Sequence, residues 1–342
     1  MNKKRIYSIA VILLLIAGVI STNYYQKIFG NSISKDGSIY IGSSSSINEI
    51  ATLLIPFVED TGDFIWLAAK KKFTKPKGGM YVLQKDMSLN DVINLLRTGQ
   101  QTPVKITFNN QNTIEDLAGR IAQQIEPDSV SILTAIKDSM FLTTNSLTDK
   151  SVLEIFIPNS YELYWNTSAE KFRDRMFKEY NRFWTQSRLK KATEINLSKS
   201  QVSTLASIVQ KETAQQLERP TVAGLYLNRL RKKWPLQADP TIIYILKEKH
   251  GKDFVVKRVL NKDLAIKSPY NTYLNRGLPP SLIAMPDISA IDAVLNADKH
   301  NYFYMCVNIE KLGFHKFAST LKQHNRNAAK YQSWISKQGI NR

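Results

Sequence analysis

The chain has 342 residues, 43% of them hydrophobic, which is enough for one large domain or two ordinary domains with real cores. Lys and Arg number 47 against 29 Asp and Glu, and the net charge of +18 suits an anionic polymer, a membrane surface or nucleic acid. The single cysteine, Cys306, excludes an internal disulfide and a thiolate zinc cluster, and the four histidines show no ligand spacing, so we expect no metal and no other cofactor.

The chain begins with a basic flank and an apolar helix. Residues 3–5 are basic, and no charge follows from Ile6 to Gln26, which is about the length that spans a bilayer. Residues 1–26 are therefore predicted to be a cytoplasmic N-terminus and a single-pass anchor in the cytoplasmic (inner) membrane. Basic residues stay on the cytoplasmic side, so the remaining chain is expected outside. A cleaved signal peptide is the alternative, although no clear small-x-small cleavage site follows.

A polar tether at 27–35 is predicted to lead into a small mixed module, residues 36–102. A short alternating run, "SIYIG", and a strand at 80–83 are each followed by a serine and an amphipathic helix, at 47–54 and 89–96. Ser88 is placed as the N-cap of the second helix. The densest basic run, "KKKFTKPK", is interpreted as a solvated face or a contact with anionic lipid or wall polymer.

A second, larger domain is predicted for residues 103–342. It opens with an alternating strand, "PVKITF", and a helix with apolar residues on one face. An aromatic and Asn-rich loop, "IPNSYELYW", precedes further helices, and loops rich in Pro, Asn and Gly follow. The chain closes with a helix at 288–297, the alternating strand "NYFYMCVN" and a helix after Ser319. Strands and helices mix without a regular βαβ period, so the predicted fold class is α+β.

One helix of this domain ends on an acid. The apolar stripe of the helix is formed by Val202, Leu205, Ile208 and Val209. At 100° per residue Glu212 falls in the middle of this stripe, while Gln210 and Lys211 point elsewhere. Apolar surroundings disfavour the ionised carboxylate and raise its pKa, which makes Glu212 a candidate proton donor near neutral pH. The alternatives are an exposed helix end and a structural ion pair with a nearby Lys or Arg.

Polar residues with several interpretations follow this helix. Asp239 precedes a proline and an apolar run, as a helix N-cap does, and that interpretation is favoured over catalysis for Asp239 alone. Arg219 and Arg229 are interpreted as solvated or as partners of Glu218. Amides and aromatic rings together suit sugars, and two loops supply them: Asn159, Tyr161, Tyr164, Trp165, Tyr270, Asn271 and Tyr273. Each aromatic residue taken singly also fits an ordinary core.

Four blocks carry a family resemblance. They are "LASIVQKETAQQLERPTVAGLYLNRL", "LQADPTIIY", "YNTYLNRGLPPSLIAMP" and "HKFASTLKQHNRNAAKY". In this order they resemble the endolytic murein transglycosylases, the YceG-like family, and the resemblance covers most of residues 80–340. It implies a LysM-like module at 36–102, a YceG-like catalytic domain at 103–342 and an anchor in the cytoplasmic membrane.

The resemblance also implies an activity and its residues. The enzyme would cut nascent peptidoglycan strands internally at the N-acetylmuramic acid to N-acetylglucosamine β-1,4 bond, leave 1,6-anhydro ends and so end strand elongation. The glutamate of the "KET" block, Glu212, would be the catalytic acid. Gln210 stands where many relatives have another glutamate. Further candidates, for binding the sugar in the cleft, are Asn159, Tyr161, Gln237, Asp239, Tyr270 and Asn271.

Two other classes of function stay open on the sequence. A noncatalytic peptidoglycan-binding scaffold at the membrane would use the same module and anchor. Nucleic-acid binding is suggested by the charge alone, but the lysines are spread along the chain and the anchor places the domain outside, so no nucleic-acid partner is expected. The expected partners are peptidoglycan strands and the cytoplasmic membrane, with peptidoglycan synthases as further candidates.

Overall fold

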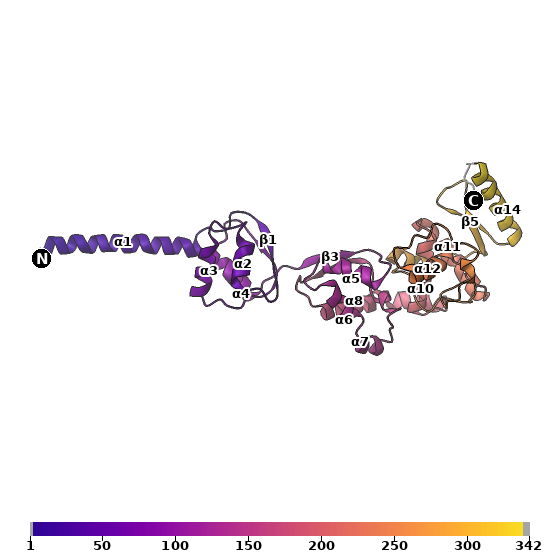
Figure 1. Ribbon diagram of the computed structural model, residues 1–342, viewed down its shortest axis with the longest axis horizontal. Coiled ribbons are helices and arrows are strands. Elements are labelled where there is room, and N and C mark those ends of the chain that lie inside the picture. Colours follow the sequence, from indigo (N-terminus) through magenta and orange to yellow (C-terminus); the bar gives the residue numbers. More distant parts are fainter. Residues whose placement is uncertain (1–2, 338–342) are drawn as a thin grey trace. The chain divides into compact units, whose positions relative to one another are not determined.

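The computed structural model describes residues 3–337, and Figure 1 labels its elements. The extreme ends of the predicted anchor and catalytic domain, residues 1–2 and 338–342, lie outside this range. Contacts divide the chain into two compact units. The first comprises the residues up to Ile106 with Ile121–Asp128 and Ser160–Ser168, and the second comprises Thr107–Arg120, Ser129–Asn159 and the residues from Ala169 onward. The units interleave along the chain, so the boundary at 102/103 stays a prediction.

Helix α1 (Lys3–Phe29) opens the chain. Residues 4–29 are apolar and long enough to cross a membrane, and none of the apolar window is buried by other parts of the structure. A helix of 26 residues rises about 39 Å, which exceeds the hydrocarbon thickness of a bilayer. These properties are consistent with a single-pass anchor.

A small module with its own core follows α1. Its elements are β1 (Gly37–Ile41), α2 (Ile47–Leu54), α3 (Thr61–Lys70), β2 (Gly79–Leu83) and α4 (Leu89–Thr98). Strands β1 and β2 are antiparallel, and Ile39 lies opposite Tyr81. Ser46 and Ser88 each form a capping box at the start of a helix, because the serine side chain and the acid three residues later satisfy each other's backbone amides. The predicted cap at Ser88 is confirmed.

The predicted tether is packed rather than free. Helix α1 continues through Lys27, which pairs with Asp63 of α3. Ile33 is buried in the module's core, and the Ser34 amide donates to the Phe57 carbonyl over 2.8 Å. An apolar side chain at Ile33 explains the difference, since burying it holds the flanking polar residues against the module.

The next part of the chain contains short helices and one strand pair. Its elements are β3 (Val104–Phe108), α5 (Ile114–Ala122), α6 (Ser129–Ile136), α7 (Ser139–Thr144), η1 (Val152–Ile155), β4 (Asn159–Leu163), α8 (Ala169–Phe183) and α9 (Gln186–Glu194). Strands β3 and β4 form a two-stranded sheet. The segment "IPNSYELYW", predicted as a loop, therefore contains a strand, in which Tyr161 and Leu163 are buried and Glu162 between them is exposed. That alternation is a strand signal, and the turn-like Pro and Asn before it obscured it.

Among the remaining elements, one central helix packs against three others. The remaining elements are α10 (Lys199–Glu212), η2 (Gln216–Glu218), α11 (Arg219–Arg231), α12 (Asp239–His250), η3 (Asp263–Ala265), α13 (Ile288–Leu295), β5 (Tyr304–Val307), β6 (His315–Ala318) and α14 (Leu321–Lys337). Helix α10 contacts α11, α12 and α13. Strands β5 and β6 are antiparallel, and α14 contacts both. The mixed helix and strand architecture predicted from the sequence is confirmed.

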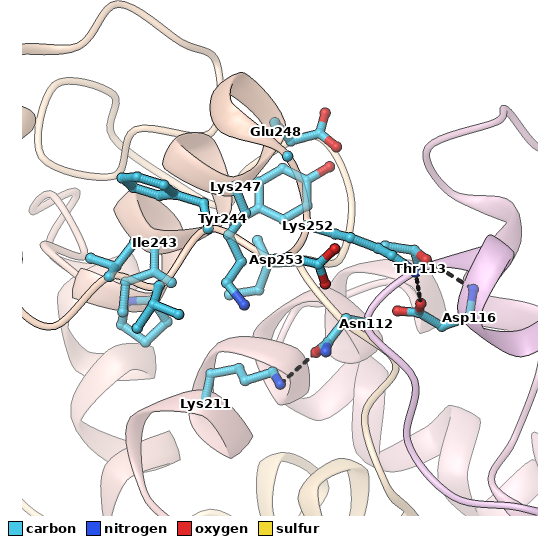
Figure 2. A pocket seen from close by; sticks show the side chains of 16 residues that line it. Asn112, Thr113, Asp116, Lys211, Ile243, Tyr244, Lys247, Glu248, Lys252 and Asp253 are labelled. Atoms are coloured by element: carbon cyan, nitrogen blue, oxygen red, sulfur yellow. Dashed lines mark hydrogen bonds and ion pairs between the residues drawn. The ribbon is translucent and has the colours of Figure 1, made fainter.

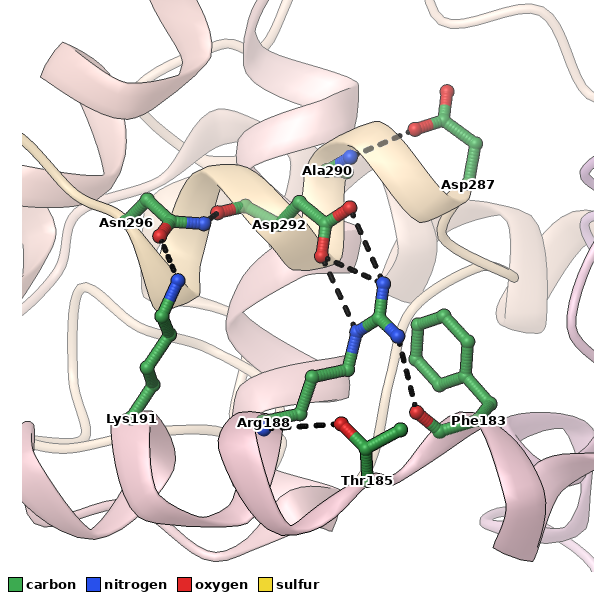
Figure 3. A network of polar contacts seen from close by, with 8 residues as sticks. All are labelled: Phe183, Thr185, Arg188, Lys191, Asp287, Ala290, Asp292 and Asn296. Atoms are coloured by element: carbon green, nitrogen blue, oxygen red, sulfur yellow. Dashed lines mark hydrogen bonds and ion pairs between the residues drawn. The ribbon is translucent and has the colours of Figure 1, made fainter.

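Polar contacts fix α13 beside α9, as Figure 3 shows. The Arg188 guanidinium of α9 contacts the Asp292 carboxylate of α13 at 3.2 Å, and Lys191 bonds Asn296 one turn further along. Asp287 caps the start of α13 by accepting from the Ala290 amide at 2.8 Å. Because α13 also packs on α10, these contacts help to fix the central helix.

Candidate active site

Helix α10 is buried on nearly every side. It begins with a capping box between Ser198 and Gln201, and all residues from Val202 to Gln210 are buried. Ser207 satisfies its hydroxyl internally by donating to the Thr204 carbonyl at 2.7 Å. The predicted division into an apolar face and a polar face is therefore too simple, because small hydroxyl side chains can enter a core once they bond the helix backbone.

Gln210 is buried, contrary to the expectation that it lies off the inward face, and it has a separate task. Its Nε2 donates to the Met285 carbonyl at 3.2 Å, and its Oε1 accepts from the Asp287 amide at 2.6 Å. The side chain thus ties α10 to the segment that leads into α13. Gln210 and Glu212 have different neighbours, so they do not occupy equivalent positions in the site.

Glu212 is the last residue of α10 and has an unusual environment. The residue is partly exposed, but its Oε2 atom is buried and has no hydrogen-bond partner in the part of the chain that the structure describes. Burial raises the pKa of Glu212 from 4.5 to about 7. The charge of His315, the nearby Tyr226 hydroxyl and the charge of Arg229 oppose this rise in pKa, and the charge of Asp239 adds to it. At neutral pH the protonated and the ionised carboxyl group are therefore both well populated.

Helix α11 supplies two of these neighbours. The Tyr226 hydroxyl is buried and, like Glu212 Oε2, has no hydrogen-bond partner among the described residues. Arg229 Nε donates to the Phe303 carbonyl at 2.8 Å and its Nη1 to the Leu236 carbonyl, so backbone oxygens position this cation. Gly224 allows the helix to lie close to the chain after α13, since a Cβ there would meet the Asp298 carbonyl oxygen at 2.4 Å.

His315 on β6 forms a buried ion pair with Glu218. Its Nδ1 lies 2.8 Å from Glu218 Oε1, and its backbone amide donates to Oε2 at 2.6 Å. Burial lowers the pKa of His315, but the hydrogen bond and charge of Glu218, with the charge of Glu212, outweigh it and raise the pKa overall. Glu218 thus favours the imidazolium, whose positive charge acts on Glu212.

Helix α12 places an exposed carboxylate at the same site. Asp239 is the first residue of α12 and Ala238 is the N-cap, so the predicted capping role of Asp239 is wrong. The Asp239 side chain instead accepts a hydrogen bond from the Tyr273 hydroxyl. Gln237, two residues earlier, is exposed and has a φ of 50°. Its backbone amide donates to the Thr272 carbonyl at 3.0 Å. This bend presents Asp239 at the helix N-terminus.

The arginines have other partners than predicted. Arg219 is buried and contacts Asp287 at 2.8 Å and the Ser289 hydroxyl at 2.6 Å. Neither Arg219 nor Arg229 pairs with Glu218, because that carboxylate is occupied by His315. The expectation that both arginines are solvated or hold Glu218 is therefore corrected.

Tyr270 and Asn271 lie in a closely bonded loop. The Tyr270 hydroxyl shares a 2.6 Å hydrogen bond with Ser281 and its ring packs on Tyr244. Asn271 is fully buried, and its side-chain amide donates to the carbonyls of Leu264 and Ile266. Its Oδ1 accepts from the Tyr273 amide at 2.9 Å. Asn271 therefore orders the loop that holds Tyr273 on Asp239.

Asn159 and Tyr161 stand on β4, Asn159 exposed and Tyr161 buried. The groups that act on the Glu212 carboxyl come from α11, α12 and β6. The structure thus groups Glu212 with Asp239 and Tyr273, places Gln237 and Asn271 beside them, and leaves the roles of Asn159 and Tyr161 as predictions.

Four site residues escape sequence reasoning: Tyr226, Arg229, Tyr273 and His315. All four lie within the family blocks, but no spacing joins any of them to Glu212. His315 follows Glu218 by 97 residues in the chain, and local periodicity gives no signal at that separation. Within residues 3–337 there is no group of three or more His, Cys, Asp and Glu arranged to hold a metal ion.

The chemistry available here is proton transfer by one carboxyl group. A desolvated acid with a pKa of about 7 is close to the ideal for a group that must give and then take a proton near neutral pH. Arg229 and His315 stabilise the carboxylate once the proton has left. Asp239 supplies a negative charge on the exposed side of the same site.

Comparison with known proteins shows which family the chain resembles. The model of the YceG-like family matches residues 39–330. An endolytic murein transglycosylase of Bacillus subtilis (strain 168) is 32% identical over 333 residues, covering 90% of this chain and 89% of that protein. An endolytic murein transglycosylase of Streptococcus pneumoniae serotype 2 is 28% identical, covering 86% of this chain and 58% of that protein. The crystal structure of a YceG-like protein from Listeria monocytogenes superimposes with a TM-score of 0.57 and 27% identity, over 85% of this chain and 98% of that one.

Proposed function

The chain belongs to the YceG-like family, and we propose on this premise that it is an endolytic murein transglycosylase in which Glu212 is the catalytic acid and base. The observation that carries the assignment is the buried Oε2 atom of Glu212, which finds no hydrogen-bond partner among residues 3–337 and belongs to a carboxyl group with a pKa of about 7. A purely structural acid would have been paired, as Glu218 is with His315.

The proposed reaction breaks the β-1,4 bond between N-acetylmuramic acid and N-acetylglucosamine without water. Glu212 gives its proton to the glycosidic oxygen, and the N-acetylglucosamine leaves with that proton. The resulting carboxylate then takes the proton of the muramyl 6-hydroxyl, whose oxygen attacks the anomeric carbon and closes a 1,6-anhydro ring. One acid is sufficient for both steps, because the nucleophile belongs to the substrate.

The surrounding charges fit the two steps. His315 and Arg229 stabilise Glu212 as a carboxylate between the proton transfers, and this opposes the effect of burial. Asp239 is exposed, so it can face the sugar and stabilise the oxocarbenium-like charge. Gln237 is exposed beside it as a hydrogen-bond partner for the sugar. Asn271 acts through the loop that holds Tyr273 against Asp239.

The remaining candidates have less direct roles. Asn159, which is exposed, and Tyr161, which is buried, stay proposed sugar-binding residues, and the buried Tyr270 supports the loop that holds Tyr273. The module of residues 36–102, with its own core, is proposed to be LysM-like and to hold the strand. Helix α1 is proposed to run from a cytoplasmic N-terminus so that both parts lie outside the cytoplasmic membrane, where peptidoglycan synthases work.

Replacement of Glu212 by Gln tests the function directly. Purified protein is incubated with intact and peptide-stripped sacculi, and the new glycan ends are identified by mass spectrometry. The wild-type protein is expected to release 1,6-anhydromuramyl ends and the variant none, with an unchanged circular dichroism spectrum. Glu194→Gln, at the exposed end of α9, is the matched control and should retain activity. An active Glu212→Gln protein would refute the assignment, and a wild-type protein that binds sacculi without producing anhydro ends would indicate a scaffold.

A further inference from the structure

A cavity of about 770 Å³ adjoins the candidate active site, and its lining is drawn in Figure 2. Lys211 and Pro240 belong to the lining, and they are the immediate chain neighbours of Glu212 and Asp239. Consecutive Cα atoms are about 3.8 Å apart, so the rim of the cavity begins within one residue of both acids. Glu212 itself does not line the cavity, which is therefore a separate space beside the site.

The cavity contains charged groups without ion-pair partners. Lys252 is paired with Asp116 at 2.9 Å. Among the ion pairs of residues 3–337, none involves Lys211, Lys247 or Asp253. Side chains without an ion-pair partner in a cavity are available to a charged ligand.

Two of these groups are ammonium groups close to each other. Lys211 Nζ donates to Asn112 Oδ1 at 2.8 Å, a neutral partner that leaves its charge uncompensated. Figure 2 shows the Lys211 and Lys247 side chains directed into the same space. Desolvation and then the positive charge of Lys247 lower the pKa of Lys211, which is the effect of like charges at short range. A ligand carboxylate between them would relieve this repulsion.

The cavity also offers apolar surface. Phe254 is 41% and Val255 75% exposed, although both are large apolar side chains. Tyr244 contributes a ring to the lining. Beside the paired side chains of Asp116, Glu248 and Lys252, the lining thus offers two cations and one carboxylate without ion-pair partners, together with apolar patches. It suits a short peptide that carries carboxylates, an ammonium group and small aliphatic side chains.

We propose that this cavity binds the stem peptide of the glycan strand, with Lys211 and Lys247 contacting its carboxylates and Asp253 its free ammonium group. This inference rests on the proposed function. The stem peptide is attached to the lactyl group of N-acetylmuramic acid, the sugar whose bond is cut at Glu212, so a strand positioned for cleavage brings its peptide to this rim. An ammonium group that is already cross-linked would lose its charge, so the cavity favours strands before cross-linking.

Binding is measured with the full-length Glu212→Gln protein in detergent, which leaves the ligand intact. The probe is N-acetylmuramyl pentapeptide with lysine as its third residue, titrated by calorimetry. Introducing Lys247→Met into this Glu212→Gln parent is expected to weaken binding of the probe about tenfold, which corresponds to about 1.4 kcal/mol. Lys249→Met, on the same helix but exposed and outside the cavity, is the matched control and should bind as the parent does. Equal affinity of the Lys247→Met and Lys249→Met proteins would overturn the proposal.

A second arm tests the role of Asp253. Acetylation of the lysine side chain of the probe removes its charge and is expected to weaken binding to the parent protein several-fold. With Asp253→Asn the acetylated and free peptides should bind equally. If acetylation weakens peptide binding by both proteins to the same extent, the ammonium group of the peptide does not contact Asp253 and the assignment of Asp253 is wrong.

Activity separates this proposal from the proposed function. The ratio of kcat/KM for peptide-bearing over peptide-stripped glycan is expected to exceed one for the wild-type protein and to fall toward one for Lys211→Met/Lys247→Met. A wild-type ratio of one, with anhydro ends from both substrates, overturns the peptide site alone. If neither substrate yields anhydro ends, the proposed function is overturned. The calorimetric result on peptide binding does not depend on that outcome.

Discussion

Replacing Glu212 by Gln is expected to stabilise the fold at alkaline pH while it removes activity. The folded-state pKa of about 7 lies above the ordinary value of 4.5. Below pH 4.5 the carboxyl group is protonated in both the folded and the unfolded chain. Between the two values the unfolded chain releases the proton while the folded chain retains it, so the free energy of unfolding falls as the pH rises. The loss is complete above pH 7, and glutamine avoids it because it does not ionise.

The size of the effect follows from the pKa difference. The step from 4.5 to about 7 is about 2.5 pH units, and at about 1.4 kcal/mol per unit it corresponds to about 3 kcal/mol. For a folded body of this size that free energy corresponds to a rise in Tm of roughly 6–12 °C. The expected gain is an upper value, since a folded protein can relax around a carboxylate once it ionises.

Thermal unfolding of both proteins in the same detergent measures this effect. At pH 8.5 the Glu212→Gln protein should melt several degrees above the wild type, and at pH 5 the difference should largely vanish. Glu194→Gln, which removes an exposed carboxylate, should show no comparable gain at either pH. If Glu212→Gln melts at or below the wild-type temperature at pH 8.5, the carboxyl group is not desolvated in the folded protein and the reasoning fails.

Three further substitutions test the electrostatics and the scaffold. Glu218→Gln should lower the pKa of His315, remove a positive charge near Glu212 and move the alkaline limb of the kcat/KM profile up by about one pH unit. Asp239→Asn removes a negative charge near Glu212 and should move the alkaline limb of the same profile down by about half a pH unit. Shifts in the same direction for Glu218→Gln and Asp239→Asn would contradict the charge assignments. Arg219→Ala leaves a partner carboxylate unpaired and should lower the free energy of unfolding by about 3 kcal/mol in urea titrations, whereas a loss below about 1 kcal/mol would mean that this pair is not effectively buried.

Local patterns predicted much of the fold. The capping serine at Ser88, the helices at 47–54 and 89–96 and the strands "SIYIG" and "NYFYMCVN" depend on neighbouring residues, and the structure contains them. The acid at the end of an apolar helix was also visible, because Glu212 and its stripe lie within three turns of one helix. Patterns of this range are complete in the sequence itself.

The features that were missed depend on contacts between distant residues. Strand β6 is four residues long and has little alternation, yet it brings His315 to Glu218 and its charge to Glu212. The sequence favoured a helix cap at Asp239 because the proline after it fits the first turn of a helix. The actual partner of the Asp239 side chain is the Tyr273 hydroxyl, 34 residues away, which no local pattern indicates. The burial of α10 from Val202 to Gln210 was hidden by its polar side chains, of which Ser203 and Ser207 satisfy their hydroxyls within the helix.

The pH dependence of kcat/KM tests the central claim most directly, since kcat/KM reports the pKa of the free enzyme's catalytic acid. Release of 1,6-anhydromuramyl ends by the wild-type protein is followed from pH 5 to pH 9 at constant ionic strength. The account predicts a plateau on the acid side and a decline whose midpoint lies at about pH 7, the pKa of Glu212. A decline centred near the ordinary carboxyl value of 4.5, or a rate that does not fall by pH 9, would contradict it.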